Sequence, residues 1–117
     1  MLPNRMQLTS QCEEQLKKLK GFTSITPNIA ARLAFFRSIE SSFRYIPERD
    51  FKKLDGSLIL DKITWLGETL LSTELILKMI YPNLNDRERL NAWAAHVEDG
   101  ISNLRNQRSL LLFMKSL

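Results

Sequence analysis

The chain opens with alternating polar and apolar side chains. From Arg5 to Thr9, Met6 and Leu8 fall on one side while Arg5, Gln7 and Thr9 fall on the other. Because successive side chains of a strand point to opposite faces, this alternation predicts a short, half-buried strand.

Two helices are predicted next. Ser10 with Glu13 three residues later fits a capping box, and Gly21 is expected to end this first helix. The second helix is expected to start with Thr26 as N-cap and Pro27 in the first turn, and to stop before Pro47. Apolar residues at helical spacing form a stripe on each helix: Leu8, Cys12, Leu16 and Leu19 on the first, and Ile29, Leu33, Phe36, Ile39 and Phe43 on the second.

The remaining pattern predicts one loop and more helices. Residues 44–57 hold a proline, a glycine and seven charged residues, which is typical of an exposed loop. Residues 58–81 are predicted to form one long helix that Pro82 ends. Its apolar side chains lie nearly all round the helix, as expected of a central helix surrounded by others. Asn85 and Glu88 form a second capping box. The stripe that follows comprises Leu90, Trp93, Val97, Ile101 and Leu104, and Leu110–Leu117 are expected to form a short closing helix.

The predicted fold is therefore all-α, or mainly helical, with a short N-terminal strand followed by about five helices. We expect a single domain over residues 1–117, with a basic, ribbon-helix-helix-like subregion at 1–45 and a helical subregion at 58–117. In ribbon-helix-helix proteins two chains pair their strands in a groove of DNA. In that layout Arg5, Gln7 and Thr9 point outward, and the helix N-terminus at Thr26 offers backbone N–H groups to a phosphate.

Charge is concentrated in the first half of the chain. Ten basic and five acidic residues give residues 1–53 a charge of +5, while seven and eight give residues 54–117 a charge of −1. A one-sided positive field favours a polyanion, although a merely solvated basic surface has the same composition.

The composition favours a cytoplasmic protein without a membrane partner. The one cysteine, Cys12, can form no internal disulfide, and the N-terminus lacks the apolar core of a secretory signal. Charged residues interrupt the most apolar stretch, 59–81, which argues against a membrane span.

Chemistry-bearing residues are few. Glu68 and His96 are the minimal set for proton transfer, but a buried pair holding two helices together explains them better. Gly100, one turn above His96, leaves room for a group to pack over the imidazole. Cys12 falls on an apolar stripe, where a thiol is usually inert. The sequence has no metal-ligand spacing, glycine-rich phosphate loop or nucleophile elbow. We therefore predict no catalytic residue, no metal site, no cofactor and no enzymatic activity.

Four segments resemble one known family in order along nearly the whole chain: NRMQLT (4–9), TPNIAARLAFFRSIE (26–40), ITWLGE (63–68) and AHVEDGISNL (95–104). The chain resembles the DndE family of bacterial DNA sulfur modification proteins, which act in replacing a non-bridging phosphate oxygen of DNA with sulfur. The resemblance implies a helical protein that forms homo-oligomers, described as tetramers. It also implies binding of double-stranded DNA, with nicked duplex favoured, and action beside other phosphorothioation proteins that perform the sulfur chemistry.

Six cations are the candidate DNA contacts: Lys17, Lys18, Lys20, Arg5, Arg37 and Arg44. The three lysines lie on the solvent side of the first helix, where they would otherwise complement the helix dipole by about 0.3–1 kcal/mol each. Arg37 and Arg44 are expected on one face of the second helix, where each can equally pair with Glu40 or Glu48.

The resemblance also assigns an oligomer contact to the turn after the first helix, here Gly21, Phe22 and Ser24. The predicted function is a DNA-binding accessory subunit of a phosphorothioation complex. The alternative is a non-enzymatic adaptor whose basic half docks an acidic protein.

Overall fold

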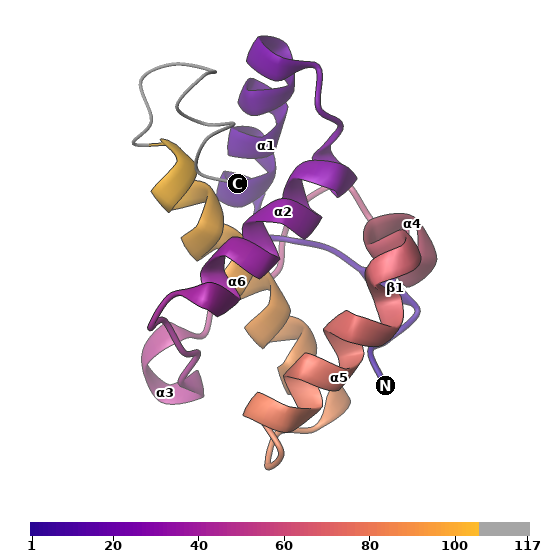
Figure 1. Cartoon of the computed structure of the whole chain (residues 1–117), viewed down its shortest axis with the longest axis vertical. Helices are drawn as coiled ribbons and strands as arrows, with labels where there is room; N and C mark the ends of the chain where they lie inside the picture. Colours follow the sequence, from indigo (N-terminus) through magenta and orange to yellow (C-terminus); the bar gives the residue numbers. More distant parts are fainter. Residues whose placement is uncertain (106–117) are drawn as a thin grey trace.

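The structure, a computed structural model, describes residues 1–105 (Figure 1). Its elements are β1 (Arg5–Met6), α1 (Ser10–Thr23), α2 (Pro27–Glu40), α3 (Pro47–Asp50), β2 (Leu60–Asp61), α4 (Lys62–Leu66), the 3-10 helix η1 (Gly67–Thr69), α5 (Leu70–Ile80) and α6 (Asp86–Arg105). The predicted class, a mainly helical fold with a short N-terminal strand, is confirmed.

Helices α2 and α6 cross at the centre, and their contact differs from the predicted one. The buried face of α2 consists of Ala30, Ala31, Ala34, Phe35 and Ser38. The predicted stripe of larger side chains is correct only in part, since Phe36 and Ile39 pack half-buried against the core while Ile29 is 39% exposed. A Cβ atom added at Gly100 of α6 would overlap the backbone of Ala34. Small residues thus let the two helices approach closely, and the larger side chains of α2 flank the crossing.

The start of α6 is as predicted. The backbone N–H of Asn85 donates to Glu88 Oε1 at 3.0 Å, and the Glu88 N–H donates to Asn85 Oδ1 at 2.8 Å. This reciprocal pair satisfies two N–H groups that the first turn leaves without helical partners. The first four residues of the predicted stripe, Leu90, Trp93, Val97 and Ile101, are buried. The side chain of Leu104 and the expected helix Leu110–Leu117 lie outside the described residues.

The predicted long helix over residues 58–81 is wrong. β2, α4, η1 and α5 occupy this stretch instead, and the helix breaks at Gly67, whose φ of +51° favours glycine. The guanidinium of Arg32 lies against Gly67 and donates to the carbonyl oxygens of Trp65 at 2.8 Å and Thr64 at 3.1 Å. A side chain from α2 thereby satisfies the carbonyl end of α4.

Strand β1 pairs within the same chain. Arg5 is opposite Asp61 and Met6 opposite Leu60 in an antiparallel ladder. The indole N–H of Trp65 also donates to the Met6 carbonyl at 2.8 Å. One edge of the predicted ribbon strand is therefore used internally.

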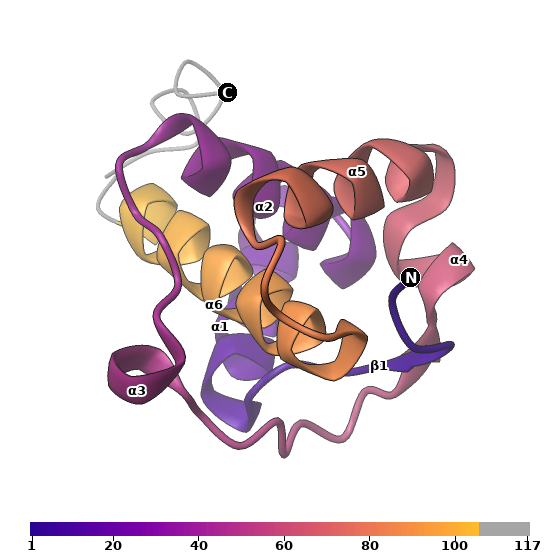
Figure 2. The ribbon, with the colours of Figure 1, turned by 90° about the horizontal axis from the view of Figure 1, so that it is seen from below.

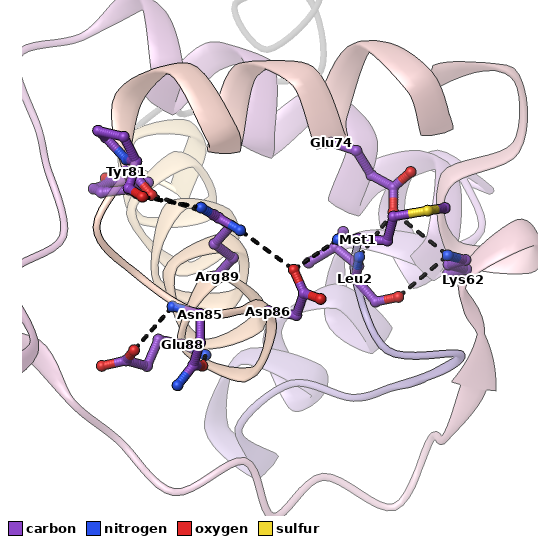
Figure 3. A network of polar contacts seen from close by, with 10 residues as sticks. Met1, Leu2, Lys62, Glu74, Tyr81, Asn85, Asp86, Glu88 and Arg89 are labelled. Carbon is purple, nitrogen blue, oxygen red and sulfur yellow. Dashed lines mark hydrogen bonds and ion pairs between the residues drawn. The ribbon is translucent and has the colours of Figure 1, made fainter.

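The residues before β1 are fixed to α5 by polar contacts (Figure 3). The Leu2 N–H donates to Glu74 Oε2 at 2.8 Å, and Lys62 Nζ lies 3.2 Å from the Leu2 carbonyl oxygen and 3.4 Å from the same carboxylate. The charges of Lys62 and Glu74 are thus engaged inside the fold.

Residues 44–57 run along one edge of the molecule, with α3 as their one helical turn (Figure 2). The Tyr45 N–H donates to the Tyr81 hydroxyl at 2.8 Å, and Lys52 pairs with Glu98 at 2.7 Å. Within residues 1–105, no helix combines the length and apolar character needed to cross a membrane.

Candidate nucleic-acid interface

The outer face of α1 carries three of the predicted cations. Thr9, not the predicted Ser10, caps this helix, because its hydroxyl accepts from the Cys12 N–H at 3.1 Å. Burial of Leu8, Cys12 and Leu16 fixes the inner face. The outer face consequently exposes Lys17, Lys18 and Lys20, as predicted.

Lys17 differs from its two neighbours because it has an acidic partner. Its ammonium lies 3.1 Å from Glu13 Oε1, one turn earlier. Burial would raise the pKa of the Glu13 carboxyl, but hydrogen bonds from the Leu58 N–H and the Ser57 hydroxyl, together with Lys17, hold that pKa below its usual range. Glu13 is therefore an anion that orders the loop at residues 57–58, not the second half of a capping box.

Lys18 and Lys20 form no ion pair within residues 1–105. Both are exposed, and Lys20 lies in the last turn of α1. They are therefore available to an external anion.

Arg37 and Arg44 do not share a helix face. α2 ends at Glu40, and Arg44 follows it with its guanidinium donating to the carbonyl oxygens of Ser41 at 3.1 Å and Phe43 at 2.6 Å. In the described part of the chain, neither arginine pairs with Glu40 or an acid elsewhere. Both remain exposed, but they are two separate cations and not one track.

The three side chains expected to point outward from the ribbon behave differently. Arg5 is exposed. Gln7 donates to the Gly56 carbonyl at 2.9 Å, and Thr9 is buried as the N-cap of α1. The prediction is wrong for Gln7 and Thr9, because β1 has only two residues and the chain turns into α1 directly after it. Thr26 is the N-cap residue of α2 and Pro27 begins the helix, as predicted, but the Thr26 hydroxyl donates to Asn28 Oδ1 at 2.6 Å and accepts no N–H of the first turn.

The six predicted cations lie in three places. In Figure 1 the C-terminal half of α1 projects at one end of the molecule, the C-terminal end of α2 lies near α3, and β1 lies beside α4. The lysines of α1 are the one close group among them, because three cations fall within about one helical turn. This group is the candidate interface.

The turn after α1 is exposed. The prediction that Gly21 ends α1 is wrong, since the helix continues to Thr23 and the left-handed cap is Ser24, with a φ of 62°. The Ser24 N–H donates to the Lys20 carbonyl at 2.8 Å. Phe22 is 84% exposed, and a Cβ added at Gly21 would have nothing within 4 Å. The predicted oligomer-contact residues therefore have their surfaces open.

His96 lies in a closed polar network, and Glu68 is not part of it. The imidazole of His96 is buried, with Nδ1 2.8 Å from Ser38 Oγ and Nε2 2.6 Å from the Tyr81 hydroxyl. The Ser38 hydroxyl donates to Asp99 Oδ2 at 2.8 Å, so it accepts from Nδ1–H, and Nε2 accepts from Tyr81. Burial, with a smaller effect of Arg44, lowers the His96 pKa to about 4.

The predicted pairing of Glu68 with His96 is therefore wrong. Glu68 is exposed in η1, and the space that Gly100 provides is filled by the α2 backbone and not by a group over the imidazole. The histidine is neutral, and its hydrogen bonds join α2, α6 and the end of α5. Such an arrangement holds helices together and presents no group to a substrate.

The thiol of Cys12 is buried, and burial raises its pKa to about 12. A thiol in this state is un-ionised near neutral pH and is a poor nucleophile. Across residues 1–105, no three His, Cys, Asp or Glu side chains are grouped to hold a metal ion.

Comparisons with known proteins agree with this fold and assign its family. The model of the DNA sulphur modification protein DndE matches residues 5–111. The chain belongs to the DndE family.

Two solved structures are similar to this chain. The crystal structure of DndE from Escherichia coli B7A, involved in DNA phosphorothioation modification, is 74% identical in sequence and has a TM-score of 0.85; the match covers 87% of this chain and 98% of that one. A DndE mutant involved in DNA phosphorothioation is 72% identical over 88% of this chain and 98% of its own, with a TM-score of 0.84. No match was found among curated proteins.

DndE family membership confirms the predicted link to DNA phosphorothioation. Two features of this family member were missed in the sequence. Glu13 is one turn from Lys17, so the sequence spacing allowed their ion pair to be predicted. The burial of Glu13 could not be predicted, because it depends on the distant Ser57 and Leu58. The exposed outer face of α5 was not detectable, because its apolar residues are those expected of a core helix.

Proposed function

We propose that this DndE family member is a DNA-binding accessory subunit, which holds the duplex backbone while other phosphorothioation proteins perform the sulfur chemistry. The observation that carries the proposal is the exposed lysine group on α1, of which Lys18 and Lys20 have no acidic partner within residues 1–105. Contacts of this kind position a protein on DNA without reading its sequence.

The spacing of the lysines suits a phosphate backbone. Lys17 to Lys20 rise about 4.5 Å along the helix axis, and successive phosphates of one strand rise about 3.4 Å along the axis of the duplex. Lysine is a flexible point charge on a long stem, so adjacent phosphates are within reach of neighbouring lysines. Exposed Arg5, Arg37 and Arg44 would add contacts if the duplex follows the protein surface beyond α1.

Preference for nicked duplex is part of the same proposal. A nick interrupts one strand and lowers the cost of bending at that point. Backbone on both sides of the nick can then approach one protein surface, which increases the number of phosphate contacts.

The proposal includes no catalytic step by this chain. The un-ionised Cys12 thiol and the neutral, fully hydrogen-bonded His96 support it, because neither is prepared as a nucleophile or base for a substrate. We expect that the purified protein does not cleave, ligate or sulfurate DNA. We expect the protein to act in the cytoplasm. An activity of the wild type that Cys12→Ser or Glu68→Gln abolishes would place a catalytic site at that residue.

Self-association is also proposed, with Gly21, Phe22 and Ser24 in the contact and a tetramer as the expected assembly. The exposed phenyl ring of Phe22 supports this, because aromatic side chains are enriched at protein interfaces. The same ring next to lysines favours the alternative function, an adaptor whose basic half docks an acidic protein.

Salt dependence separates DNA binding from the adaptor function. Affinity for intact, nicked and single-stranded DNA should be measured by gel shift across a range of salt concentrations. Several phosphate contacts predict a steep, linear fall of log affinity with log salt, and nicked duplex bound most tightly. Absence of duplex binding at low salt, with binding of an acidic protein under the same conditions, would favour the adaptor.

A further inference from the structure

The outer face of α5 is an exposed apolar stripe. Leu71, Leu75 and Met79 follow one another at one-turn intervals and are 79%, 59% and 71% exposed, while Thr73 and Leu77 on the opposite side are buried. We call Leu71, Leu75 and Met79 the α5 stripe. A continuous row of large apolar side chains on a helix indicates a surface that another protein covers.

A hollow beside the stripe has room for one side chain of that protein. Its volume is about 200 Å³, and its lining includes Leu2, Leu77 and two members of the stripe, Leu71 and Leu75. Pockets that hold cofactors and drug-sized ligands are larger. The suitable occupant is therefore one apolar side chain of a protein that lies along the stripe.

One charge at the hollow has no counterion. The lining also contains Glu74, Lys78 and Arg89. Glu74 lies 3.4 Å from Lys62 Nζ, and Arg89 lies 3.3 Å from Asp86 (Figure 3). Lys78 is exposed and forms no ion pair among the residues that the structure describes. The occupant of the hollow should therefore carry a carboxylate close to its apolar side chain.

The spacing of these groups suits a helix as the partner segment. The α5 stripe rises about 12 Å from its first residue to its last, which is about two helical turns. Lys78 is three residues after Leu75, so the two side chains are neighbours on the helix surface. An amphipathic helix with apolar side chains four residues apart and an acid within one turn of them presents the matching groups.

The charges of α5 indicate a partner other than a second α5 or DNA. The acid of α5 is Glu74, and its carboxylate is engaged by Lys62 and by the Leu2 N–H. A second α5 therefore offers Lys78 no free carboxylate. With one free cation over two turns, the stripe also gives a phosphate backbone little to bind.

We propose that the α5 stripe binds an amphipathic helix of another phosphorothioation protein, whose apolar side chain enters the hollow while an adjacent carboxylate pairs with Lys78. This inference rests on the proposed function, in which other proteins perform the sulfur chemistry, and it assigns the surface that joins one of them to this chain. In Figure 1, α5 and the C-terminal end of α1 lie at different ends of the molecule. The partner protein and a duplex on α1 can therefore be bound at the same time.

Photo-cross-linking tests the site and the partner together. The photoreactive amino acid p-benzoylphenylalanine replaces Leu75, and the protein is produced in cells that carry the other phosphorothioation proteins. Irradiation should join it to one of these proteins, and mass spectrometry should map the joined peptide to a helix with the apolar and acidic spacing given above. The same amino acid at Phe51, another exposed apolar position, should give at least a fivefold lower yield. Cross-links to none of these proteins, cross-links only to a second copy of this chain, or equal yields at both positions would overturn the proposal.

Binding of the cross-linked protein in purified form tests the contact itself. Leu75→Glu should weaken this binding at least tenfold, with helical content unchanged by circular dichroism, while Phe51→Glu should stay within twofold of the wild type. The duplex affinity of Leu75→Glu should also stay within twofold. A wild type that binds the partner protein but no duplex would reject DNA binding and support the α5 contact. Unchanged partner binding by Leu75→Glu, or Leu75-dependent binding to phosphatidylglycerol vesicles, would overturn the α5 contact.

A charge-reversal cycle tests the pairing of Lys78. Lys78→Glu should weaken partner binding about fivefold, because it places like charges opposite each other. Changing the facing acid of the partner to lysine should do the same, and the two changes together should recover most of the wild-type affinity. The control Lys53→Glu reverses an exposed cation outside α5 and should have less than a twofold effect. Losses that simply add when the two changes are combined would overturn the acidic partner.

Discussion

The outer faces of α1 and α5 have the same local structure and opposite surface chemistry. Each helix buries apolar residues, such as Leu16 in α1 and Leu77 in α5, and exposes the other side to solvent. On α1 the exposed side carries three lysines, and on α5 it carries the three apolar residues of the α5 stripe. An amphipathic inner face therefore fixes a helix in the fold, while the outer face determines what it binds. α1 suits a hydrated polyanion, and α5 suits an apolar partner.

The α2–α6 crossing supports both surfaces, so a substitution that disrupts this crossing should destabilise the protein more than any other change considered below. Gly100→Val should cost about 3 kcal/mol or more in the free energy of unfolding, because its side chain has no room beside Ala34. Urea denaturation followed by circular dichroism measures the loss. Gly21→Ala is the control, with open space around the added methyl group, and should be neutral or stabilising by up to about 1 kcal/mol. Equal stability of the two variants would show that the crossing tolerates a side chain.

Acid should lower the free energy of unfolding through the buried His96. The His96 pKa is lowered from 6.5 to about 4 in the folded protein. Between pH 6.5 and pH 4, His96 is therefore protonated in the unfolded chain and neutral in the folded protein. The stabilisation is fully present above pH 6.5 and is lost as pH falls towards 4, a change of about 3 kcal/mol. Urea unfolding at several pH values measures this slope.

His96→Gln is the variant that isolates the effect. It should be less stable at pH 7, because Ser38 and Tyr81 lose their present partner, and its stability should change less between pH 6.5 and 4. An unchanged slope in the variant would assign the acid sensitivity to other groups, such as Glu13, whose lowered pKa acts in the same direction.

The outer face of α1 is tested by reversing its charges. Lys17, Lys18 and Lys20 changed together to Glu should weaken binding to duplexes of any sequence at least tenfold, because phosphate contacts carry no base information. Helical content should be unchanged, since all three side chains are exposed, while Lys17→Glu should lower the free energy of unfolding slightly by repelling Glu13. Affinity equal to that of the wild type would exclude these lysines as contacts.

The smallest expected effects on DNA binding are those of single lysine substitutions in α1. Lys18→Gln should weaken DNA binding about threefold, and Lys17→Gln by less than twofold, because Glu13 already neutralises part of the Lys17 charge. Fluorescence anisotropy with one labelled duplex resolves such a difference. A larger loss for Lys17→Gln would mean that Lys17 leaves Glu13 when DNA binds.

Sequence patterns correctly predicted the features of the fold that depend on residues close together in the chain. The Asn85–Glu88 cap and the inner stripe of α1 were correct because the residues involved are neighbours along the helix. The buried face of α2 was not predicted, because Ala34 is buried by its contact with Gly100, a residue far along the chain. The same reason applies to the break at Gly67, which is stabilised by Arg32 of α2.

The candidate site was predicted in part for similar reasons. Exposure of the α1 lysines follows from helical spacing alone. The pairing of Lys17 was missed because the burial of Glu13 depends on residues 57–58. The partners of His96 come from α2 and the end of α5, and no spacing in the sequence relates them.

The central claim, that the α1 lysines hold the DNA backbone, is tested most directly by the salt dependence of two charge-matched variants. Lys18→Glu/Lys20→Glu and Lys53→Glu/Arg87→Glu change the net charge equally, but only the first pair lies at the end of α1. The slope of log affinity against log salt should become shallower by about one to two for the α1 pair and stay close to wild type for the other. Equal slopes in the two variants would show that overall charge, and not the α1 surface, determines binding, and would contradict the account.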